Sequence, residues 1–129
     1  MTAEAVGSWF KQIPMRLRRD FARDLKAIAD QLASDIKSAA PVGETGKLQS
    51  SVRVRRGKDT LEYYIFAGGP DTTKEVRQGS GVFYDYALAI EFGTKKMEAQ
   101  PFFYSTYQLK KEEVRNKIYT AAAKSVLSA

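Results

Sequence analysis

The side chains that could carry out catalysis are restricted in type, because the chain contains no cysteine and no histidine. Thiolate nucleophiles, disulfides and cysteine–histidine zinc sites are therefore excluded, as is acid–base catalysis by imidazole. Among the carboxylates, Asp20 and Asp24 are one helical turn apart and Glu112 and Glu113 are adjacent, which is typical of solvated faces. Glu91 lies among apolar residues without a partner base, so we expect it to accept backbone hydrogen bonds rather than to catalyse.

Residues 42–50, VGETGKLQS, contain a Gly-Lys pair like that of phosphate-binding loops. Such a loop needs G-x-x-x-x-G-K-[ST], preceded by a strand and followed by a helix. Here Pro41 stands where the first glycine belongs, and Leu48 replaces the hydroxyl that would hold magnesium. The segment also follows a predicted helix and precedes a predicted strand, which is the reverse order. We therefore predict no nucleotide, no other cofactor, no metal and no enzymatic activity.

Basic residues outnumber acidic ones and give the chain a net charge of +6. This balance suits an anionic partner such as DNA, although charge alone identifies no partner. Two groups of basic residues are candidates for DNA contact: Arg16, Arg19, Arg23 and Lys26 on one face of a predicted helix, and Arg53 with Arg55 on a predicted strand. For the helical group a solvated face opposite the apolar stripe is the favoured interpretation.

Two segments have the apolar spacing of long helices. Residues 15–40 carry an apolar stripe at steps of three and four, and Pro41 ends it. The second stripe begins at Pro101, a residue favoured at the first position of a helix, and continues to about residue 126. The two predicted stripes are Leu17, Phe21, Leu25, Ile28, Leu32, Ile36 and Ala39, followed by Phe103, Tyr107, Val114, Ile118 and Ala122.

Between these helices the pattern predicts strands and turns. Residues 48–56 and 61–67 alternate between apolar and polar side chains and predict an antiparallel hairpin. Residues 68–80 are glycine-rich and lack periodicity, so we expect a mobile loop that becomes ordered only on assembly. A strand near residues 82–84 and a helical turn over 86–91 are expected next.

This order predicts an α+β fold in which two long helices pack on one face of an antiparallel β-sheet, with a short helical turn before the C-terminal helix. The 129 residues fit one domain. We expect residues 1–14 to be a lead segment, in which Trp9, Phe10 and Ile13 could dock on the body, and residues 15–129 to be the domain. An apolar run of membrane-spanning length and a signal peptide are both lacking, so we expect a cytoplasmic product.

Three motifs occur in order between residues 41 and 103: PVGETGKLQSSVRV, YALAIEFGT and the continuation KKMEAQPFF. From about residue 15 to 126 the chain resembles a family of minor tail and neck proteins of long-tailed bacteriophages. The family pattern includes Thr-Gly-x-Leu-x-x-Ser-Ile/Val, then Tyr-Ala-x-x-x-Glu-x-Gly-Thr, then Met-x-Ala-x-Pro-Phe. The motif residues here are Thr45, Gly46, Leu48, Tyr86, Glu91, Gly93, Thr94, Pro101 and Phe102.

The resemblance implies a tail-completion or head–tail joining protein: a structural subunit of a ring in the phage neck. Its expected partners are further copies of itself in a hexameric ring, a head-closing stopper, and a tail terminator or tail-tube protein. Double-stranded DNA would pass nearby without sequence-specific contact, and no membrane is involved. We expect assembly in the host cytoplasm and a final location in the virion. The motifs are expected to determine the fold first and interfaces second, and the Arg53/Arg55 patch to face the channel.

Two other functional classes stay open from the residues alone. A free basic nucleic-acid-binding protein would bind DNA strongly at low salt and lose affinity steeply as salt rises. A small enzyme using carboxylates or lysine would have a pocket containing ionisable groups with shifted pKa values.

Overall fold

The computed structural model describes residues 14–43, 45–59 and 61–127. Within them the long helices are α2 (Met15–Ala39) and α5 (Phe102–Leu127), and the short helices are α3 (Lys47–Ser51) and α4 (Tyr86–Phe92). Strands β1 (Arg53–Arg56) and β2 (Tyr63–Phe66) form one antiparallel hairpin, and β3 (Thr73–Glu75) and β4 (Phe83–Asp85) form another. A 3₁₀ turn, η1 (Pro70–Thr72), precedes β3. The lead segment predicted for residues 1–14 lies outside the described residues except for Pro14.

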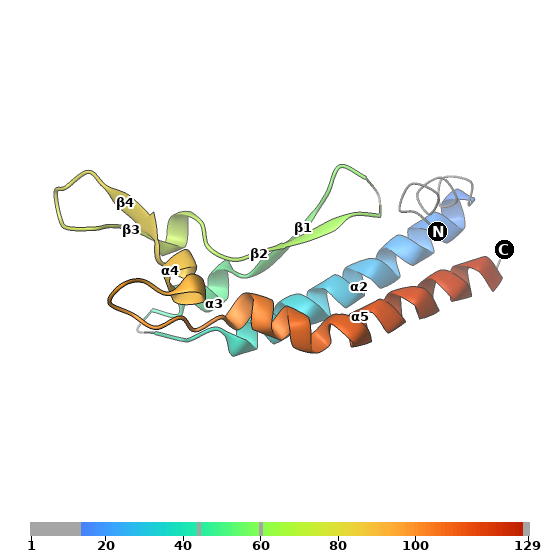
Figure 1. The fold of residues 1–129 in the computed structure, drawn as a ribbon. Coiled ribbons are helices and arrows are strands. Elements are labelled where there is room, and N and C mark those ends of the chain that lie inside the picture. Colours follow the sequence, from blue (N-terminus) through green and yellow to red (C-terminus); the bar gives the residue numbers. More distant parts are fainter. Residues whose placement is uncertain (1–13, 44, 60, 128–129) are drawn as a thin grey trace.

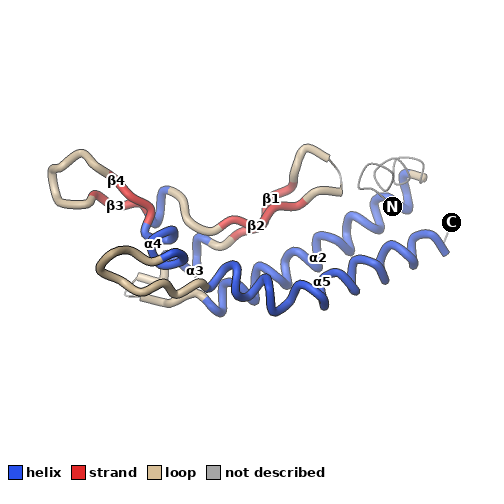
Figure 2. The backbone as a smooth tube through the Cα atoms, in the orientation of Figure 1, coloured by secondary structure: helices blue, strands red, loops and turns tan. Residues whose placement is uncertain are grey.

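Helices α2 and α5 run antiparallel side by side and form the long body of the molecule (Figure 1). The β1–β2 hairpin lies along helix α2. The β3–β4 hairpin lies next to helix α4 and projects from the end of the body at which α2 ends and α5 begins (Figure 2). Helix α2 begins and helix α5 ends at the same end of the molecule. The described chain is therefore elongated, with α3, α4 and the β3–β4 hairpin at one end and the β1–β2 hairpin along α2.

Helix α2 has the apolar stripe that the sequence predicts. Six of its residues are buried: Leu17, Phe21, Ala22, Leu32, Ala33 and Ile36. Leu25 and Ile28, also expected in the stripe, are only half-buried. Ala39 is exposed while Ala40 is buried, because the helix ends at Ala39 and Ala40 is already extended, so helical spacing no longer applies there.

Helix α5 follows its predicted bounds, but its buried line begins one residue earlier than the predicted stripe. Phe102 and Thr106 are buried, whereas Phe103 is half-buried and Tyr107 is exposed. Further along, Ala121 and Ser125 are buried, and the Ser125 hydroxyl donates to the Ala121 carbonyl at 3.1 Å. Hydroxyls satisfied within the helix can be buried, and hydrophobicity alone does not reveal such positions.

The predicted class, α+β, is correct, but the arrangement of two long helices on one face of one sheet is only partly found. The structure contains two separate two-stranded hairpins instead of a single sheet. Helix α2 contacts both β1 and β2, while helix α5 packs mainly on α2. A two-stranded hairpin is too small to cover two helices, so most of the apolar surface of the helices is buried between them.

The expected strand over residues 48–56 is wrong for its first half, because residues 47–51 form helix α3. Gly46 has φ +66° at the start of this helix, and the Ser50 hydroxyl donates to the Gly46 carbonyl at 3.1 Å. Leu48 and Val52 are four residues apart and both buried, a spacing that fits a helical turn as well as alternation. Alternation begins only with Arg53.

The segment predicted as an unstructured loop, residues 68–80, contains the turn η1 and strand β3. Strand β3 finds its partner in β4, where Thr73 pairs with Asp85 and Glu75 with Phe83. The expected strand near residues 82–84 and helical turn over 86–91 are both confirmed as β4 and α4. The hydrogen bonds of β3 come from β4, eight to twelve residues further along the chain, and the sequence pattern of residues 68–80 alone does not indicate this pairing. Mobility of this segment stays a prediction.

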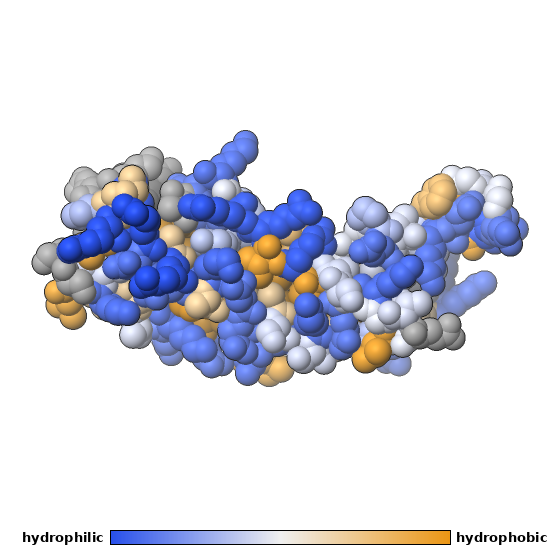
Figure 3. All heavy atoms as spheres, turned by 180° about the vertical axis from the view of Figure 1, so that it is seen from behind, coloured by the Kyte–Doolittle hydropathy of each residue, from blue (hydrophilic) through white to orange (hydrophobic). Residues whose placement is uncertain are grey.

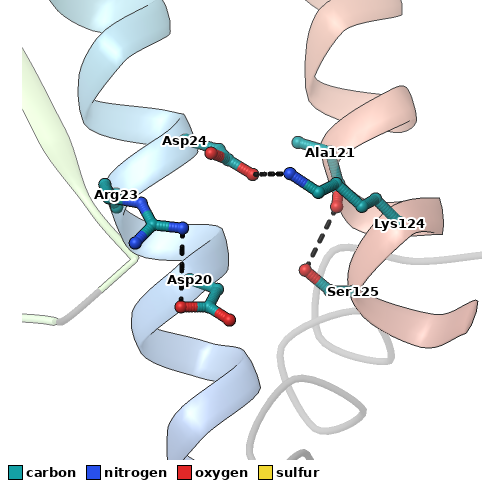
Figure 4. A network of polar contacts seen from close by, with 6 residues as sticks. All are labelled: Asp20, Arg23, Asp24, Ala121, Lys124 and Ser125. Atoms are coloured by element: carbon teal, nitrogen blue, oxygen red, sulfur yellow. Dashed lines mark hydrogen bonds and ion pairs between the residues drawn. The ribbon is translucent and has the colours of Figure 1, made fainter. Parts of the chain in front are cut away.

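An ion pair also joins the two long helices near the end where α5 finishes (Figure 4). The Lys124 ammonium lies 3.9 Å from an Asp24 carboxylate oxygen on α2, and Arg23 pairs with Asp20 on the same helix at 3.6 Å. These pairs are largely exposed, and exposed pairs add little to stability. The apolar contact between the helices is therefore the main interaction that holds them together.

One core cluster links most elements, and Ile36 is its most buried member, with 1% of its surface exposed. We expect Ile36→Ala to lower the free energy of unfolding by about 2–5 kcal/mol, because it leaves a cavity in packed surroundings. Urea denaturation followed by circular dichroism measures this. Leu109→Ala is the matched control, since Leu109 is 83% exposed, and should change stability by less than about 0.5 kcal/mol. Equal effects of both substitutions would contradict the assignment of the core.

Candidate interaction site

The three sequence motifs meet in one place. Leu48 from the first motif, Ala87 from the second and Phe102 from the third are all buried members of the core cluster that also holds Ile36. Tyr86 packs against the same cluster while half-exposed, and the Lys74 ammonium lies 5.0 Å from the centre of its ring. The motif residues thus form the junction at which helices α2, α3, α4 and α5 join.

The first motif makes the turn between α2 and α3. Gly46 has a left-handed backbone, and its N–H donates to the Val42 carbonyl at 3.1 Å. The Thr45 hydroxyl accepts the Lys47 N–H at 3.4 Å, which is a long hydrogen bond. Glycine adopts this positive φ without the strain that a side chain would cause. The turn then places Leu48 in the core.

Asp85 joins the root of the β3–β4 hairpin to helix α4. One of its carboxylate oxygens accepts from the Ala87 N–H at 2.9 Å and from the Thr72 hydroxyl at 2.6 Å, and the other accepts from the Gly69 N–H at 2.9 Å. Thr72 is fully buried. Asp85 is thus the N-cap of α4, and its remaining acceptor capacity fixes the turn η1.

Arg53 takes part in a neighbouring network. One guanidinium nitrogen donates to the carbonyls of Ser51 and Gly68, both at 2.8 Å, and the group lies 5.4 Å from the ring centre of Phe66. The Gly68 N–H donates to the Ser51 hydroxyl at 2.9 Å. A Cβ at Gly68 would lie 2.5 Å from an Asp85 oxygen, so no larger residue fits there without movement.

Glu91 behaves as the sequence predicts. Its side chain is buried, with 6% exposed, and its two carboxylate oxygens accept the backbone N–H groups of Phe103 at 2.9 Å and Tyr104 at 3.0 Å. These amides belong to the first turn of α5, where backbone donors have no partner inside the helix. The carboxylate also meets the positive end of the helix dipole. Glu91, which belongs to helix α4, therefore caps the N-terminus of helix α5.

Gly93, Thr94 and Pro101 shape the connection from α4 to α5. Gly93 has φ +77°, and a Cβ there would come within 2.8 Å of the Ala99 backbone nitrogen. Thr94 and Met97 exchange backbone hydrogen bonds at 2.8 and 3.3 Å. Pro101 directly precedes the first residue of α5. The connection thus brings the chain back beside α4, where the Glu91 carboxylate accepts the first backbone N–H groups of α5.

The predicted basic residues do not gather in one place. Arg53 and Arg55 pair with Phe66 and Tyr64 across the β1–β2 hairpin; Arg53 is half-buried and held by internal contacts, and Arg55 is exposed. The residues Arg16, Arg19, Arg23 and Lys26 are all exposed on α2. Arg23 pairs with Asp20, and Lys26 bonds to Asp30 at 2.8 Å, a hydrogen bond that raises the pKa of Lys26. The helical group is thus partly neutralised by its own helix.

A shallow apolar groove of about 210 Å³ lies between strand β2, helix α4 and the first turns of α5. Its exposed apolar members are Phe66, Leu88, Phe92 and Tyr104. Among the described residues that line it, Glu91 alone is charged, and its two oxygens are already occupied by backbone amides. Groups of exposed apolar residues of this kind mark interaction surfaces.

The projecting hairpin, residues 73–85, carries a second group of exposed apolar residues, and we call it the arm. The group consists of Val76, Val82, Phe83 and Tyr84. Seen from behind, hydrophobic side chains interrupt the hydrophilic surface both on the body and on the arm (Figure 3). Helix α4 connects the two surfaces, because the arm enters it and the groove is built on it.

The described residues offer little for catalysis or metal binding. Among them, no three histidine, cysteine, aspartate or glutamate side chains are grouped so as to hold a metal ion. None of the described helices combines the length and the apolar character that crossing a membrane requires. The carboxylates of Asp85 and Glu91 are engaged in capping bonds. The exposed apolar groups of the groove and the arm are instead of the kind that marks contacts between proteins.

A family model described as "Bacteriophage HK97-gp10, putative tail-component" matches residues 5–93. The chain belongs to this family. The matched region is more than half of the chain and includes the first motif, the second motif as far as Gly93, and all of the groove-forming helix α4. No curated protein and no solved structure matches the chain. The chain is thus a member of a phage tail-component family, as the resemblance in its sequence indicates.

Several residues of this tail-component chain were missed by sequence reasoning. Asp85 directly precedes the predicted helical turn over residues 86–91, which is the N-cap signal, and could have been found from it. The internal role of Arg53 gave no local signal, because its acceptors lie on Ser51 and on the distant Gly68. The groove also depends on contacts between β2, α4 and α5, which are distant from one another in sequence.

The capping role of Glu91 leads to a stability prediction. Glu91→Ala leaves two helix N–H groups without their acceptors, and we expect it to lower the free energy of unfolding by about 1–3 kcal/mol. Glu98→Ala is the control, because Glu98 is exposed on the connection before α5. Chemical denaturation of both variants measures the difference. A Glu91→Ala protein as stable as the control would show that the capping bonds contribute nothing.

Proposed function

We propose that this chain is a tail-completion or head–tail joining protein that forms a ring around the DNA channel in the phage neck. The observation that carries the proposal is membership of a phage tail-component family. The neck position, between a head-closing stopper and a tail terminator or tail-tube protein, is what the order of the three motifs implies. Six copies are expected in the ring, and the virion is the final location.

The surface of the subunit supports a role in a permanent assembly. The arm and the groove each expose large apolar side chains, among them Phe83 at 62% and Phe92 at 65%. A protein that works alone in water gains nothing from such groups, and they favour aggregation. A ring subunit, by contrast, has a neighbour on each side, and both contacts need apolar area.

The use of the polar residues points in the same direction. Asp85 and Glu91 accept backbone hydrogen bonds, and Arg53 donates to two carbonyls. Buried polar groups that are satisfied in this way stabilise a fixed shape rather than wait for a substrate. A structural protein needs a fixed shape more than it needs reactive groups.

Within this proposal, the DNA channel is lined by the face of the β1–β2 hairpin that carries Arg53 and Arg55. Val54 and Ile65 pack against the core, so the side chains that alternate with them face away from it. Arg55 is the exposed member and the one able to approach phosphate groups. A weakly positive wall would offset repulsion of the passing DNA without gripping a particular sequence.

The first test is deletion of the reading frame from the phage that carries it. We expect DNA-filled heads and separate tails of normal length, because the joint between them would be incomplete. Electron microscopy and plaque counts measure this outcome, and supplying the chain from a plasmid should restore joined particles. Infectious particles in normal yield without the chain would contradict the neck role, and overlong tails would indicate a tail terminator instead.

The second test concerns the channel face. We expect Arg55→Glu to reduce DNA retention and infectivity, since it places a negative charge next to DNA phosphates. Arg56→Glu is the matched control: it makes the same charge change at the next residue, which alternates to the other side of the strand. Retention of packaged DNA is measured by nuclease protection. Equal behaviour of the two variants would remove the hairpin face from the channel.

A further inference from the structure

Within the part of the chain that the structure describes, the arm has little packing beyond its root. Strands β3 and β4 have three residues each, and an isolated two-stranded hairpin is only marginally stable in water. Its root is fixed by Asp85 and Thr72, but Val76, Val82 and Phe83 are each more than half exposed. A contact from outside the described chain would therefore stabilise the arm.

The groove is concave where the arm projects, and like the arm it exposes apolar side chains. It is a concave apolar surface with Leu88 and Phe92 exposed at 61% and 65%. The arm of the same chain does not cover it, because it leaves α4 in the direction away from β2 and α5 (Figures 1 and 2). One chain thus carries an uncovered convex surface and an uncovered concave surface at different places.

We propose that the arm of one copy binds in the groove of a second copy, in a head-to-tail contact. The inference rests on the proposed function, because repeating such a contact closes a ring when the rotation between copies allows it. The exposed parts of the eight apolar side chains amount to on the order of 800 Å², given the ~150–250 Å² that one aromatic residue can bury. Flanking backbone and polar side chains bring the contact near the ~1,200 Å² of the smaller specific interfaces.

The charges on both surfaces are compatible with this contact. On the arm, the Glu75 carboxylate accepts the Gly81 N–H at 3.1 Å, and Lys74 lies over the ring of Tyr86 in its own chain. In the groove, Glu91 is held by the amides of α5. Arg77 lies in the exposed turn of the arm, where it can stay in water at the edge of the contact, so docking need not bury an unpaired charge among the apolar side chains.

The experiment compares three variants with the wild-type chain by sedimentation velocity over a concentration series. Phe83→Ser alters the arm, Leu88→Ser alters the groove, and Tyr119→Ser changes an equally exposed residue on α5 outside both surfaces. All three side chains are exposed, so folding should be kept, and circular dichroism checks this. We expect the arm and groove variants each to weaken self-association by at least about tenfold, and the control to change it little.

Mixing the arm variant with the groove variant provides the decisive readout. In this mixture the arm variant still has an intact groove, and the groove variant still has an intact arm. The two proteins should therefore form one-to-one pairs but no larger species. Absence of pairs in the mixture, or a wild-type chain that stays monomeric up to about 0.2 mM, would overturn the inference. Neither result would contradict the neck role, because that role is tested in phage particles. Conversely, normal infectious particles after deletion would contradict the neck role without changing the measured self-association.

Discussion

Helix α4 is held by the two carboxylates near its ends, and the rest of the structure depends on how it is fixed. With seven residues, it is too short to be stable alone. Asp85 caps its first turn and ties it to η1, and Glu91 near its last turn caps the start of α5. Through these bonds the helix determines the position of the arm and the point at which α5 enters the body. The helix itself forms one wall of the groove.

This constraint explains why the family motifs are distant in sequence but close in space. Leu48, Ala87 and Phe102 share one core cluster because the turn at Gly46 and the connection after Gly93 bring them to the same end of the body. The surfaces that we propose for assembly grow out of that junction. A substitution that shifts α4 would thus move the arm and the groove together, although in the proposed ring the two surfaces would contact different neighbours.

The long-range pattern of the chain could be predicted from sequence, whereas its junctions could not. Apolar spacing locates α2 and α5 within one or two residues, and the apolar surroundings of Glu91 indicate its backbone bonds. The alternating pattern wrongly predicted a strand at Leu48, because the spacing of four between Leu48 and Val52 fits both a helix and a strand. Strand β3 is defined by pairing with residues eight to twelve positions further along the chain, and Arg53 is held partly by the carbonyl of Gly68, fifteen positions away, so the local pattern reveals neither.

The antiparallel pairing of α2 with α5 has a consequence for synthesis on the ribosome. The two helices are separated by more than 60 residues, yet each covers the apolar face of the other. Until α5 has been made, the apolar stripe of α2 has no cover from α5. Contacts of such long sequence separation form slowly, and exposed apolar stripes attract one another in the meantime. Chains interrupted before α5 should therefore aggregate or be captured by chaperones instead of entering assembly.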